Sequence, residues 1–379
     1  MNFGRAFALL GISVCLGTVA LMSTRAAQAE DHVTVRGQYY REPSTRVVQP
    51  VVELGKDLPN GVDVTAHFLL DAITSASAAS GTATDSIFTE MRNEAGISVG
   101  KSWSRVRAGL AYRYSAESDY WSHMVVGSAS FRLWEDTGTL FLSFGGGRDE
   151  VGRRVQGSTP MPSIAPGCTQ TCALSTWIGG IWYSQILSPT ILVQGGLEGA
   201  LLDGFQSSPY RQVSGRGMEN VPRMRLRNAL ALRAAKYFPD ARFGLQVHYR
   251  YYQDFLGDDA WNIKSHTFEG RLFQRLGRDV EVRLTGRYYS QGAANFWCDL
   301  MTQGSCNTSS RYYANDPKLG ASSTKFAEAK VFWDATRWRA RPFLSWFSPG
   351  TFELSYGIYL QSTAFGNAHV LQTGYTLPF

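Results

Sequence analysis

The sequence predicts an all-β protein: a single transmembrane antiparallel β-barrel of about sixteen strands. Segments of about ten residues alternate apolar with polar or small side chains, the pattern of a strand with one face to lipid and one to a lumen. Beyond residue 29, no stretch approaches the roughly 20 consecutive apolar residues of a membrane helix. Aromatic residues nevertheless make up 13% of the chain, as expected where strands turn only every second side chain to lipid.

The strands are placed by this alternation and by the turn-forming residues between them. We expect strands at 32–40, 46–57, 61–71, 86–101, 104–115, 119–134, 137–149, 174–186, 189–203, 222–236, 240–254, 262–276, 279–291, 322–333, 350–361 and 367–379. The segment 334–350 is long for a turn, and 341–347 has strand character. Eighteen strands is therefore the alternative count.

The lengths of the connections alternate along the chain. Short connections rich in turn formers lie at 57–61, 102–103, 135–136, 188–189, 238–240 and 277–278, and long ones at 72–85, 150–173, 204–221 and 292–321. Bacterial barrels have short periplasmic turns and longer extracellular loops. The first strand is therefore predicted to rise from the periplasm and the last to end there.

The N-terminus has the three parts of a secretory signal. Arg5 gives the positive region, residues 6–22 form an apolar region, and Ala27-Gln28-Ala29 is a small-x-small cleavage site. We expect residues 1–29 to be a signal peptide cleaved after Ala29. Residues 30–379 then form the outer-membrane barrel.

The last eleven residues alternate apolar with small or polar side chains and end on Phe379. Leu371, Tyr375, Leu377 and Phe379 share one face of the strand because successive side chains point to opposite sides. Such a strand resembles the C-terminal signal that outer-membrane barrel assembly machinery reads, carried here by Tyr375, Leu377 and Phe379. This predicts the Gram-negative outer membrane as the location, with its lipid and the assembly machinery as partners.

Four cysteines follow the signal, as the close pairs Cys168/Cys172 and Cys298/Cys306. An exported chain passes through an oxidising periplasm, so we expect one disulfide within each pair. Zinc is the rival interpretation of the Cys-x₃-Cys spacing, but no histidine lies nearby. No metal and no cofactor is predicted.

Arginines alternate with leucines in the predicted strand 222–236, and the next three strands repeat this pattern. A charged side chain facing mid-bilayer lipid costs about 2–4 kcal/mol, so the arginine face must point into the lumen. Ten arginines are thereby placed on the inner wall of four consecutive strands: Arg223, Arg225, Arg227, Arg233, Arg242, Arg250, Arg271, Arg275, Arg283 and Arg287. A smaller group across the barrel comprises Arg105, Arg107 and Arg113.

Inward carboxylates are expected mainly on the N- and C-terminal strands, at Asp63, Asp71, Glu90, Glu94, Glu198, Glu328 and Glu353. One interpretation is structural, because arginine–carboxylate ladders across strands stabilise a polar lumen. The other is an electropositive translocation track that attracts carboxylates, phosphates or sulfates. A positive wall facing a negative wall is also a porin-like arrangement.

Aromatic residues cluster near strand ends, at 182–183, 251–252 and 288–289 and at Trp333, Trp338 and Trp346. We expect most of them in the membrane-interface girdles. The pairs 296–297 and 312–313 lie in the long loop 292–321, where loop packing is their expected role and stacking on sugar rings at a pore mouth is the alternative.

The sequence does not predict an enzyme or a nucleic-acid-binding protein. No histidines are spaced as metal ligands, and no G-x-S-x-G elbow is present. Asp63 and His67, on one inward row, form the only notable acid–histidine pairing, and a hydrogen bond in the lumen explains it. A basic lumen without a recognition motif does not indicate nucleic acid.

Three segments carry a resemblance to a known family: LPNGVDVTAHFLLDAITSASAAS at 58–80, FTEMRNEAGISVGKSW at 88–103 and FELSYGIYLQSTAFGNAHVLQTGYTLPF at 352–379. They resemble a family of exported bacterial outer-membrane barrels of unassigned function, and the likeness covers most of the mature chain. Such barrels are similar to the porin components of exopolysaccharide and capsule export machineries. The resemblance implies no catalytic residues.

The leading hypothesis is an outer-membrane pore that secretes a bacterial polysaccharide, with loop 292–321 as the constriction or lid. The better-known exopolysaccharide porins carry a periplasmic helical-repeat domain that this chain lacks, so polymer export implies separate periplasmic partners. The first alternative is a general or anion-selective diffusion porin. The second is a non-conducting surface or adhesion barrel with a filled lumen.

Overall fold

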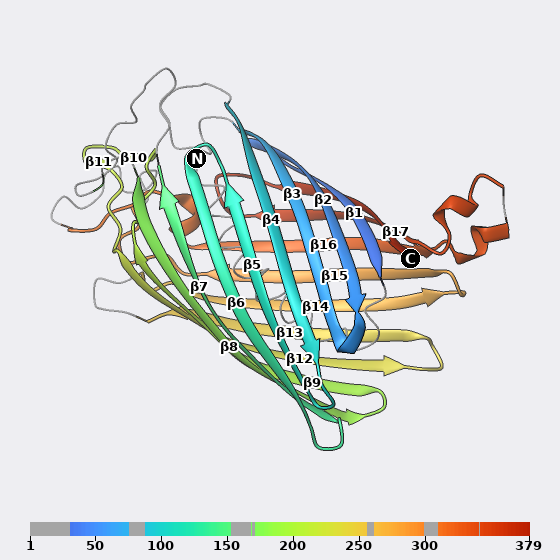
Figure 1. Cartoon of the computed structure of the whole chain (residues 1–379). Helices are drawn as coiled ribbons and strands as arrows, with labels where there is room; N and C mark the ends of the chain where they lie inside the picture. Colours follow the sequence, from blue (N-terminus) through green and yellow to red (C-terminus); the bar gives the residue numbers. More distant parts are fainter. Residues whose placement is uncertain are drawn as a thin grey trace.

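Sixteen strands close into one antiparallel barrel in the computed structural model, which describes residues 31–75, 88–152, 168, 171–255, 261–298, 310–340 and 342–379 (Figure 1). The predicted count of sixteen is confirmed and the alternative of eighteen is wrong. Around the barrel, each strand pairs with its neighbour in sequence, except that β9 pairs with β12 because β10 and β11 form a small separate hairpin. None of the helices in the described segments is long and apolar enough to cross a membrane.

The strand bounds agree with the predicted ones to within a few residues. The barrel strands are β1 His32–Glu42, β2 Thr45–Leu58, β3 Val62–Ser75, β4 Phe88–Ser102, β5 Val106–Ala116, β6 Tyr120–Leu133, β7 Gly138–Val151, β8 Cys172–Ser188, β9 Ile191–Gly204, β12 Met224–Phe238, β13 Phe243–Asp254, β14 Lys264–Leu276, β15 Val280–Gln291, β16 Ser322–Asp334, β17 Thr351–Gln361 and β18 Ala368–Pro378. The hairpin strands are β10 Gln212–Val213 and β11 Gly217–Met218.

The barrel is closed by the pairing of β1 with β18 over ten residue pairs, from His32–Pro378 to Arg41–His369. Inside the barrel, Gln372 Nε2 donates to Gln38 Oε1 at 2.6 Å across this seam. The amide of Phe379 donates to the Asp31 carbonyl at 2.8 Å. Closure pairs the backbone amides and carbonyls along the facing edges of β1 and β18, which would otherwise be left unpaired in lipid.

The two faces of the wall separate apolar from charged side chains. On β12, Leu232 is 48% exposed on the outer surface, whereas the adjacent Ala231 is 1% exposed and faces inward. The same parity continues through every register pair to β18, where Leu371 and Phe379 are exposed on the outside. The inner face carries most of the charged side chains of the strands, so the core of this protein is its lumen.

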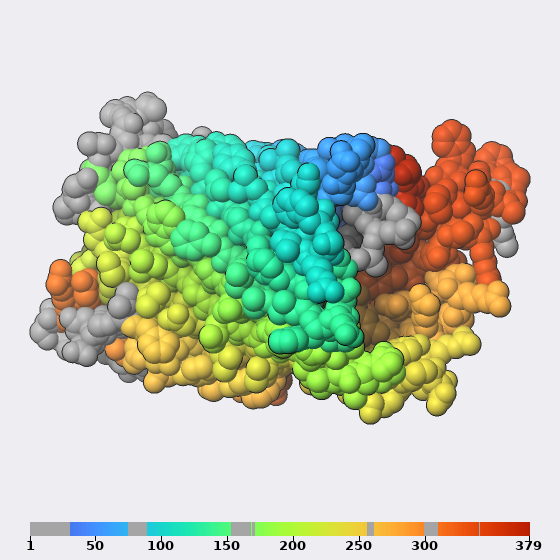
Figure 2. Space-filling view, turned by 60° about the horizontal axis from the view of Figure 1, so that its bottom comes forward, coloured from blue at the N-terminus to red at the C-terminus, as the bar shows by residue number. Residues whose placement is uncertain are grey.

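The connections keep the predicted alternation. Turns at the periplasmic end are short, and η1 (Pro59–Gly61) reverses the chain through the left-handed residues Asn60 and Gly61. The exception is 335–350, which extends beyond the barrel at this end (Figures 1 and 2). Its described residues form η3 (Thr336–Ala340) and η4 (Ser345–Phe347) instead of strands. Arg341 itself lies outside the described residues.

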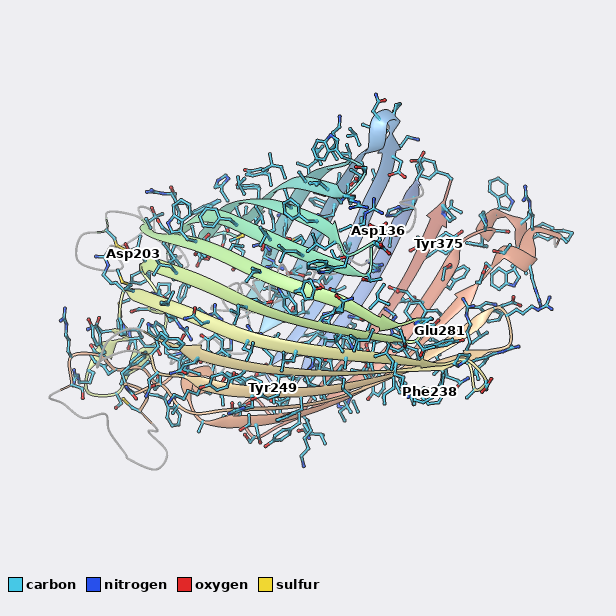
Figure 3. All side chains as sticks on the ribbon, turned by 90° about the horizontal axis from the view of Figure 1, so that it is seen from below. Asp136, Asp203, Phe238, Tyr249, Glu281 and Tyr375 are labelled. Atoms are coloured by element: carbon cyan, nitrogen blue, oxygen red, sulfur yellow. A yellow bond between two sulfur atoms is a disulfide. The ribbon has the colours of Figure 1, made fainter. Side chains whose placement is uncertain are left out.

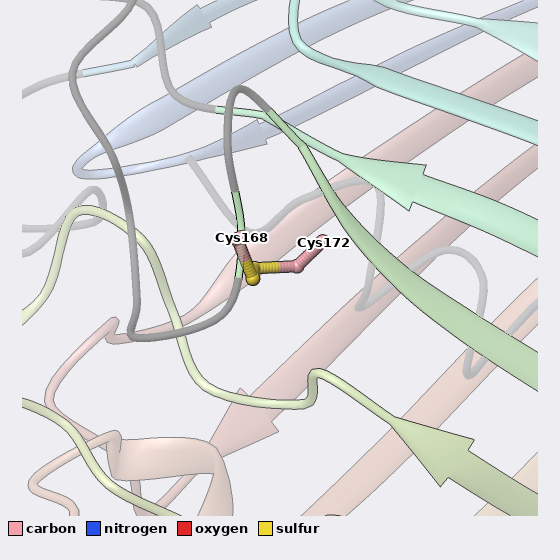
Figure 4. Close-up of a disulfide and its surroundings, with 2 residues drawn as sticks. All are labelled: Cys168 and Cys172. Carbon is pink, nitrogen blue, oxygen red and sulfur yellow. A yellow bond between two sulfur atoms is a disulfide. The ribbon is translucent and has the colours of Figure 1, made fainter.

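The predicted disulfide Cys168–Cys172 is present at the outer end, just before β8 (Figure 4). Its Cα atoms are 5.2 Å apart, within the usual range for a disulfide. Cys298 is also disulfide-bonded, but Cys306 lies outside the described residues, so the Cys298–Cys306 pairing stays a prediction. The predicted signal peptide at 1–29 also lies outside the described residues, so it stays a prediction.

The separation of faces predicts opposite effects of adding charge on the two sides. Replacing outward Leu232 by arginine should lower the free energy of unfolding by about 2–4 kcal/mol, because it places a guanidinium against lipid. Gln246→Arg, on the inward face of β13, is the matched control and should change stability little. Denaturant titration of the barrel in lipid vesicles measures both. Equal destabilisation by the two variants would contradict the assignment of faces.

Candidate functional site in the barrel lumen

The lumen has one basic wall, formed by β12 to β15. The register places eight arginines on its inner face: Arg225, Arg227, Arg233, Arg250, Arg271, Arg275, Arg283 and Arg287. Only three inward carboxylates share these four strands: Asp254, Glu269 and Glu281. The four strands therefore carry a net positive charge towards the lumen.

The facing wall is acidic. Strands β2 to β4 carry six inward carboxylates and a single inward arginine: Glu53, Asp57, Asp63, Asp71, Glu90, Glu94 and Arg92. In the closed order β3 and β13 lie half-way round the barrel from each other. The field across the lumen is therefore transverse, positive on one side and negative on the other.

Three arginines predicted on inward strands lie outside them. Arg105 and Arg223 immediately precede β5 and β12, and Arg242 occupies the turn before β13 with φ +52°. The strands start later than predicted because Pro222 lacks an amide donor and the Pro239–Arg242 turn takes up four residues. Parity alone does not place these side chains.

Half of the basic wall is neutralised by local ion pairs. Arg225 makes two 3.0 Å bonds to the carboxylate of Asp254. Glu269 accepts from both Arg271 at 2.7 Å and Arg287 at 2.6 Å. Arg250 lies 3.3 Å from Glu198. The structural interpretation as an arginine–carboxylate ladder holds for these four arginines.

Four arginines form no salt bridge with any described residue: Arg227, Arg233, Arg275 and Arg283. Arg227 Nε donates to the Tyr252 hydroxyl at 3.0 Å, and its buried Nη1 has no partner in the described part of the chain. Arg233 Nη1 donates to Gln194 Oε1 at 3.2 Å. These guanidinium groups keep donors that an anion in the lumen can accept from.

Aromatic rings line the lumen on and beside the basic wall, which the sequence pattern did not predict. Arg283 lies over Phe273 and Phe332, 4.9 and 4.7 Å from the ring centroids, and Arg287 lies 5.6 Å from the centroid of Phe326. Inward aromatic residues include Trp182, Tyr252, Phe273, Tyr289, Phe326, Phe332 and Tyr359. Trp182, Tyr252 and Tyr289 are therefore exceptions to the prediction that most of the clustered aromatic residues lie in the girdles. Their parity with the arginine rows was the signal that could have placed them.

The smaller arginine group belongs to the acidic side of the lumen. Arg107 contacts both carboxylate oxygens of Asp63, and Arg113 lies 3.8 Å from Glu94. His67 Nε2 is 3.4 Å from Glu94. Asp63 thus pairs with Arg107 and His67 with Glu94, so the predicted Asp63–His67 pairing is wrong.

Loops fold into the outer mouth and form what we call the outer plug, the described residues 205–223, 261–263, 292–298 and 310–321. Phe296 packs against Ala229 and Tyr252, two inward residues of the wall, and its ring meets Trp261 edge-on at 5.1 Å. Asn220 and Tyr313 join the two longer loops by a β-bridge. The loop predicted as a constriction, 292–321, therefore lies inside the mouth in its described parts.

The outer plug also has a charged interior. The buried Arg211 lies 3.6 Å from Glu219 and 3.9 Å from Asp316. Burial, together with the charge of Asp316, raises the pKa of Glu219 to about 7, against the opposing effect of Arg211. The plug is therefore held partly by a carboxyl group that titrates near neutral pH.

A cavity of about 710 Å³ lies near the periplasmic end of the basic wall. Its lining includes the inward Phe273, Arg275 and Glu281, Arg242 of the turn before β13, and residues 188–192 at the turn between β8 and β9. Glu281 and Phe238 mark this end of the barrel in Figure 3, and Asp203 marks the opposite end. A cavity whose lining includes three cationic side chains, Lys236, Arg242 and Arg275, therefore lies at the periplasmic end.

The fold and the charged lumen define a porin-like outer-membrane β-barrel. Residues 173–337 match a family described as "Protein of unknown function (DUF3570)". No curated protein matches the chain.

Solved outer-membrane barrels are similar in fold and remote in sequence. CdiB from Acinetobacter baumannii is 8% identical with a TM-score of 0.56, over 93% of this chain and 61% of that one. The chain therefore spans less than two thirds of CdiB. A bacterial polysaccharide outer membrane secretin is 7% identical with a TM-score of 0.49, over 93% of this chain and 99% of that one. OccD3 of Pseudomonas aeruginosa is 11% identical with a TM-score of 0.45, over 92% and 91%. The likeness to CdiB shows a shared β-barrel fold.

The buried Arg225–Asp254 pair predicts a large loss of stability on truncation. Asp254→Ala should lower the free energy of unfolding by about 3–5 kcal/mol, because it leaves a buried guanidinium without its counter-charge. The control is Asp136→Ala, which removes an exposed partner 3.7 Å from Arg132 and should cost less than about 1 kcal/mol. Unfolding in lipid vesicles measures both variants. Similar losses would show that the lumen pair is solvated.

The raised pKa of Glu219 predicts a plug that weakens as pH rises. The folded plug binds the Glu219 proton more tightly than the unfolded loop does. The stabilisation that this proton gives the folded plug is therefore complete below pH about 4.5 and is lost as pH rises through about 7. Hydrogen exchange of residues 205–223, corrected for intrinsic rates, should show less protection at pH 8 than at pH 5.5. Glu219→Gln should reduce this difference, whereas Glu135→Gln, in a periplasmic turn, should not. A pH effect of equal size in Glu219→Gln would assign it to another group.

Proposed function

We propose that this barrel is a gated outer-membrane pore for an anionic hydrophilic cargo, and that the cargo is a bacterial exopolysaccharide leaving the cell. The observation that carries the proposal is the basic wall. Four of its eight arginines lack a carboxylate partner among the described residues, and aromatic rings lie along the same wall. The proposal involves transport and no catalytic step.

The free arginines are spread along the length of the lumen. Arg275 and Arg283 lie near the periplasmic end, and Arg227 lies close to the outer plug. Arg227 and Arg233 are six residues apart on β12, about 20 Å along the strand. A polymer that enters at the periplasmic cavity therefore meets cationic groups at successive depths.

The chemistry of the wall suits an acidic polysaccharide. A guanidinium group pairs bidentately with the carboxylate of a uronic acid, or with a phosphate or sulfate substituent. The faces of Phe273, Phe326 and Phe332 offer apolar surfaces for the C–H faces of sugar rings. Several weak sites in series allow a charged cargo to enter and to leave, as in other selective pores.

The outer plug favours gated secretion over a permanently open diffusion porin. Its aromatic cluster packs on the inner wall, so cargo that moves outwards must displace it. A polymer delivered under force by a periplasmic or inner-membrane partner supplies that displacement, whereas a small solute does not. A sixteen-stranded barrel is wide enough for an aqueous channel once its loops move aside.

An anion-selective diffusion porin is the second candidate, and the transverse field across the lumen favours it. A non-conducting surface or adhesion barrel is the third, and the outer plug and the arginine–carboxylate ladder favour that alternative. Conductance separates the three, because a porin conducts steadily, a gated pore conducts only when its plug is displaced, and a filled barrel does not conduct.

Planar-bilayer recording tests the pore. The wild-type protein should give small or flickering currents, and a variant lacking residues 292–321 should give large anion-selective currents. In that open background, Arg233→Gln with Arg283→Gln should lower the anion-to-cation permeability ratio, whereas Arg46→Gln, on the outer surface, should not. A silent plug-deletion barrel that is correctly assembled would point to the non-conducting alternative.

Deleting the gene tests the cargo. Loss of the protein should abolish acidic polysaccharide on the cell surface and leave the uptake of small hydrophilic solutes unchanged. A plasmid copy should restore the polymer, and a copy with Arg233→Gln and Arg283→Gln should restore less of it. Unchanged surface polymer in the deletion strain, with reduced uptake of small anions, would favour the diffusion porin.

A further inference from the structure

Three carboxylates meet at the outer rim of the barrel, beside the acidic wall. Glu90 lies near the outer end of β4, and Glu117 and Asp119 lie in the turn between β5 and β6. One oxygen of each lies within 4.8 Å of the other two, and all three groups are buried. Three like charges this close repel one another strongly unless a cation or protons intervene.

The Glu117 carboxylate supplies a second observation. The group is buried, and its Oε1 has no hydrogen-bond partner among the described residues. The hydroxyl of Ser118, next in the turn, is likewise buried with no partner in the described part of the chain. A buried acceptor without a partner costs free energy, and a bound ligand would remove that cost.

Other contacts hold the oxygens of the cluster in place. The Ser118 amide donates to Glu90 Oε1 at 3.0 Å, and the Tyr210 hydroxyl donates to Asp119. Arg92 is a nearby cation, and its Nε donates to Oδ2 of the buried Asp71 carboxylate at 2.7 Å. Burial raises the pKa of Glu117 to about 7, with the negative charges of Asp119 and Glu90 adding to the shift and Arg92 opposing it.

We propose that Glu90, Glu117 and Asp119 bind a calcium ion at the outer rim, with the hydroxyl of Ser118 as a neutral oxygen close by. Every candidate donor is oxygen, which selects a hard cation. Calcium accepts irregular ligand sets, whereas magnesium requires a near-ideal octahedron and retains its water. The site lies at the end of the barrel that faces the external medium, where sites of millimolar to submillimolar affinity are useful.

The calcium site connects the rim to the outer plug. Tyr210 belongs to the loop 205–223, and its hydroxyl bonds the Asp119 carboxylate that would hold the ion. A bound cation fixes Asp119 and thereby fixes the anchor of that loop. External calcium should therefore tighten the outer plug, a form of regulation that adds to the proposed secretion activity and does not depend on the identity of its cargo.

The test is calcium chloride titration of the full chain, refolded in detergent free of lipopolysaccharide and followed by calorimetry at pH 7.5. We expect one saturable site with a dissociation constant of about 10⁻⁴–10⁻³ M and weaker binding of magnesium. Glu117→Gln and Glu90→Gln, which preserve shape and remove charge, should each weaken binding at least about tenfold. Asp203→Asn is the matched control, because Asp203 is an exposed carboxylate at the same end of the barrel (Figure 3). It should leave binding unchanged.

Hydrogen exchange tests the link to the plug. Calcium at 10 times its dissociation constant should raise the protection of residues 205–223 in the wild type and not in Glu117→Gln. Absence of saturable calcium binding by the wild type overturns the proposal, and so does wild-type affinity in both Gln variants. Binding without any change in protection of residues 205–223 overturns the coupling to the plug. None of these measurements involves polysaccharide, so they stand apart from the test of the proposed function.

Discussion

Closure of the sheet by the β1–β18 ladder is the constraint on which the rest of the structure depends. In a bilayer no backbone amide or carbonyl can be left unpaired, so a membrane-spanning sheet must have no edge. Once Val35 pairs with Tyr375 and Arg36 with Gly374, every side chain in the wall is assigned to lipid or lumen. The charged lumen follows from that assignment, because arginine on the lipid side would destabilise the barrel.

The inner wall combines a structural and a functional arrangement of the same residue type. Arg225 and Arg287 are neutralised by carboxylates and stabilise the wall as a ladder. Arg227, Arg233 and Arg283 have the same inward parity but contact phenol, amide and aromatic groups. A partner of opposite charge removes an arginine from anion binding, whereas a neutral partner only positions it. The proposed translocation track consists of the second group.

The outer end shows why loops decide the function of such a barrel. Three loops bring Phe296, Trp261 and Val221 together on the inner wall, and one of them brings Glu219 next to Arg211. The rim turn adds Glu117 and a contact from Asp119 to the plug. Titration at Glu219 and cation binding at Glu117 would act on one plug, since both groups lie at the same mouth. Gating of the basic lumen would then respond to the external medium.

By itself the sequence determined the barrel, its sixteen strands, its orientation and the inward face of the strand arginines. The alternation of side chains with a period of two is a property of the local sequence. The cost of placing charge in lipid then allows only one assignment of the two strand faces to lipid and lumen. The sequence also predicted Cys168–Cys172, because four residues of separation make the pairing local. Tertiary structure alone decided which charged groups pair, because cross-strand geometry brings Asp63 to Arg107 of β5 and not to the His67 that shares its row on β3. It also decided the outer plug and the Glu90–Glu117–Asp119 cluster, because loop contacts join residues that no local period relates.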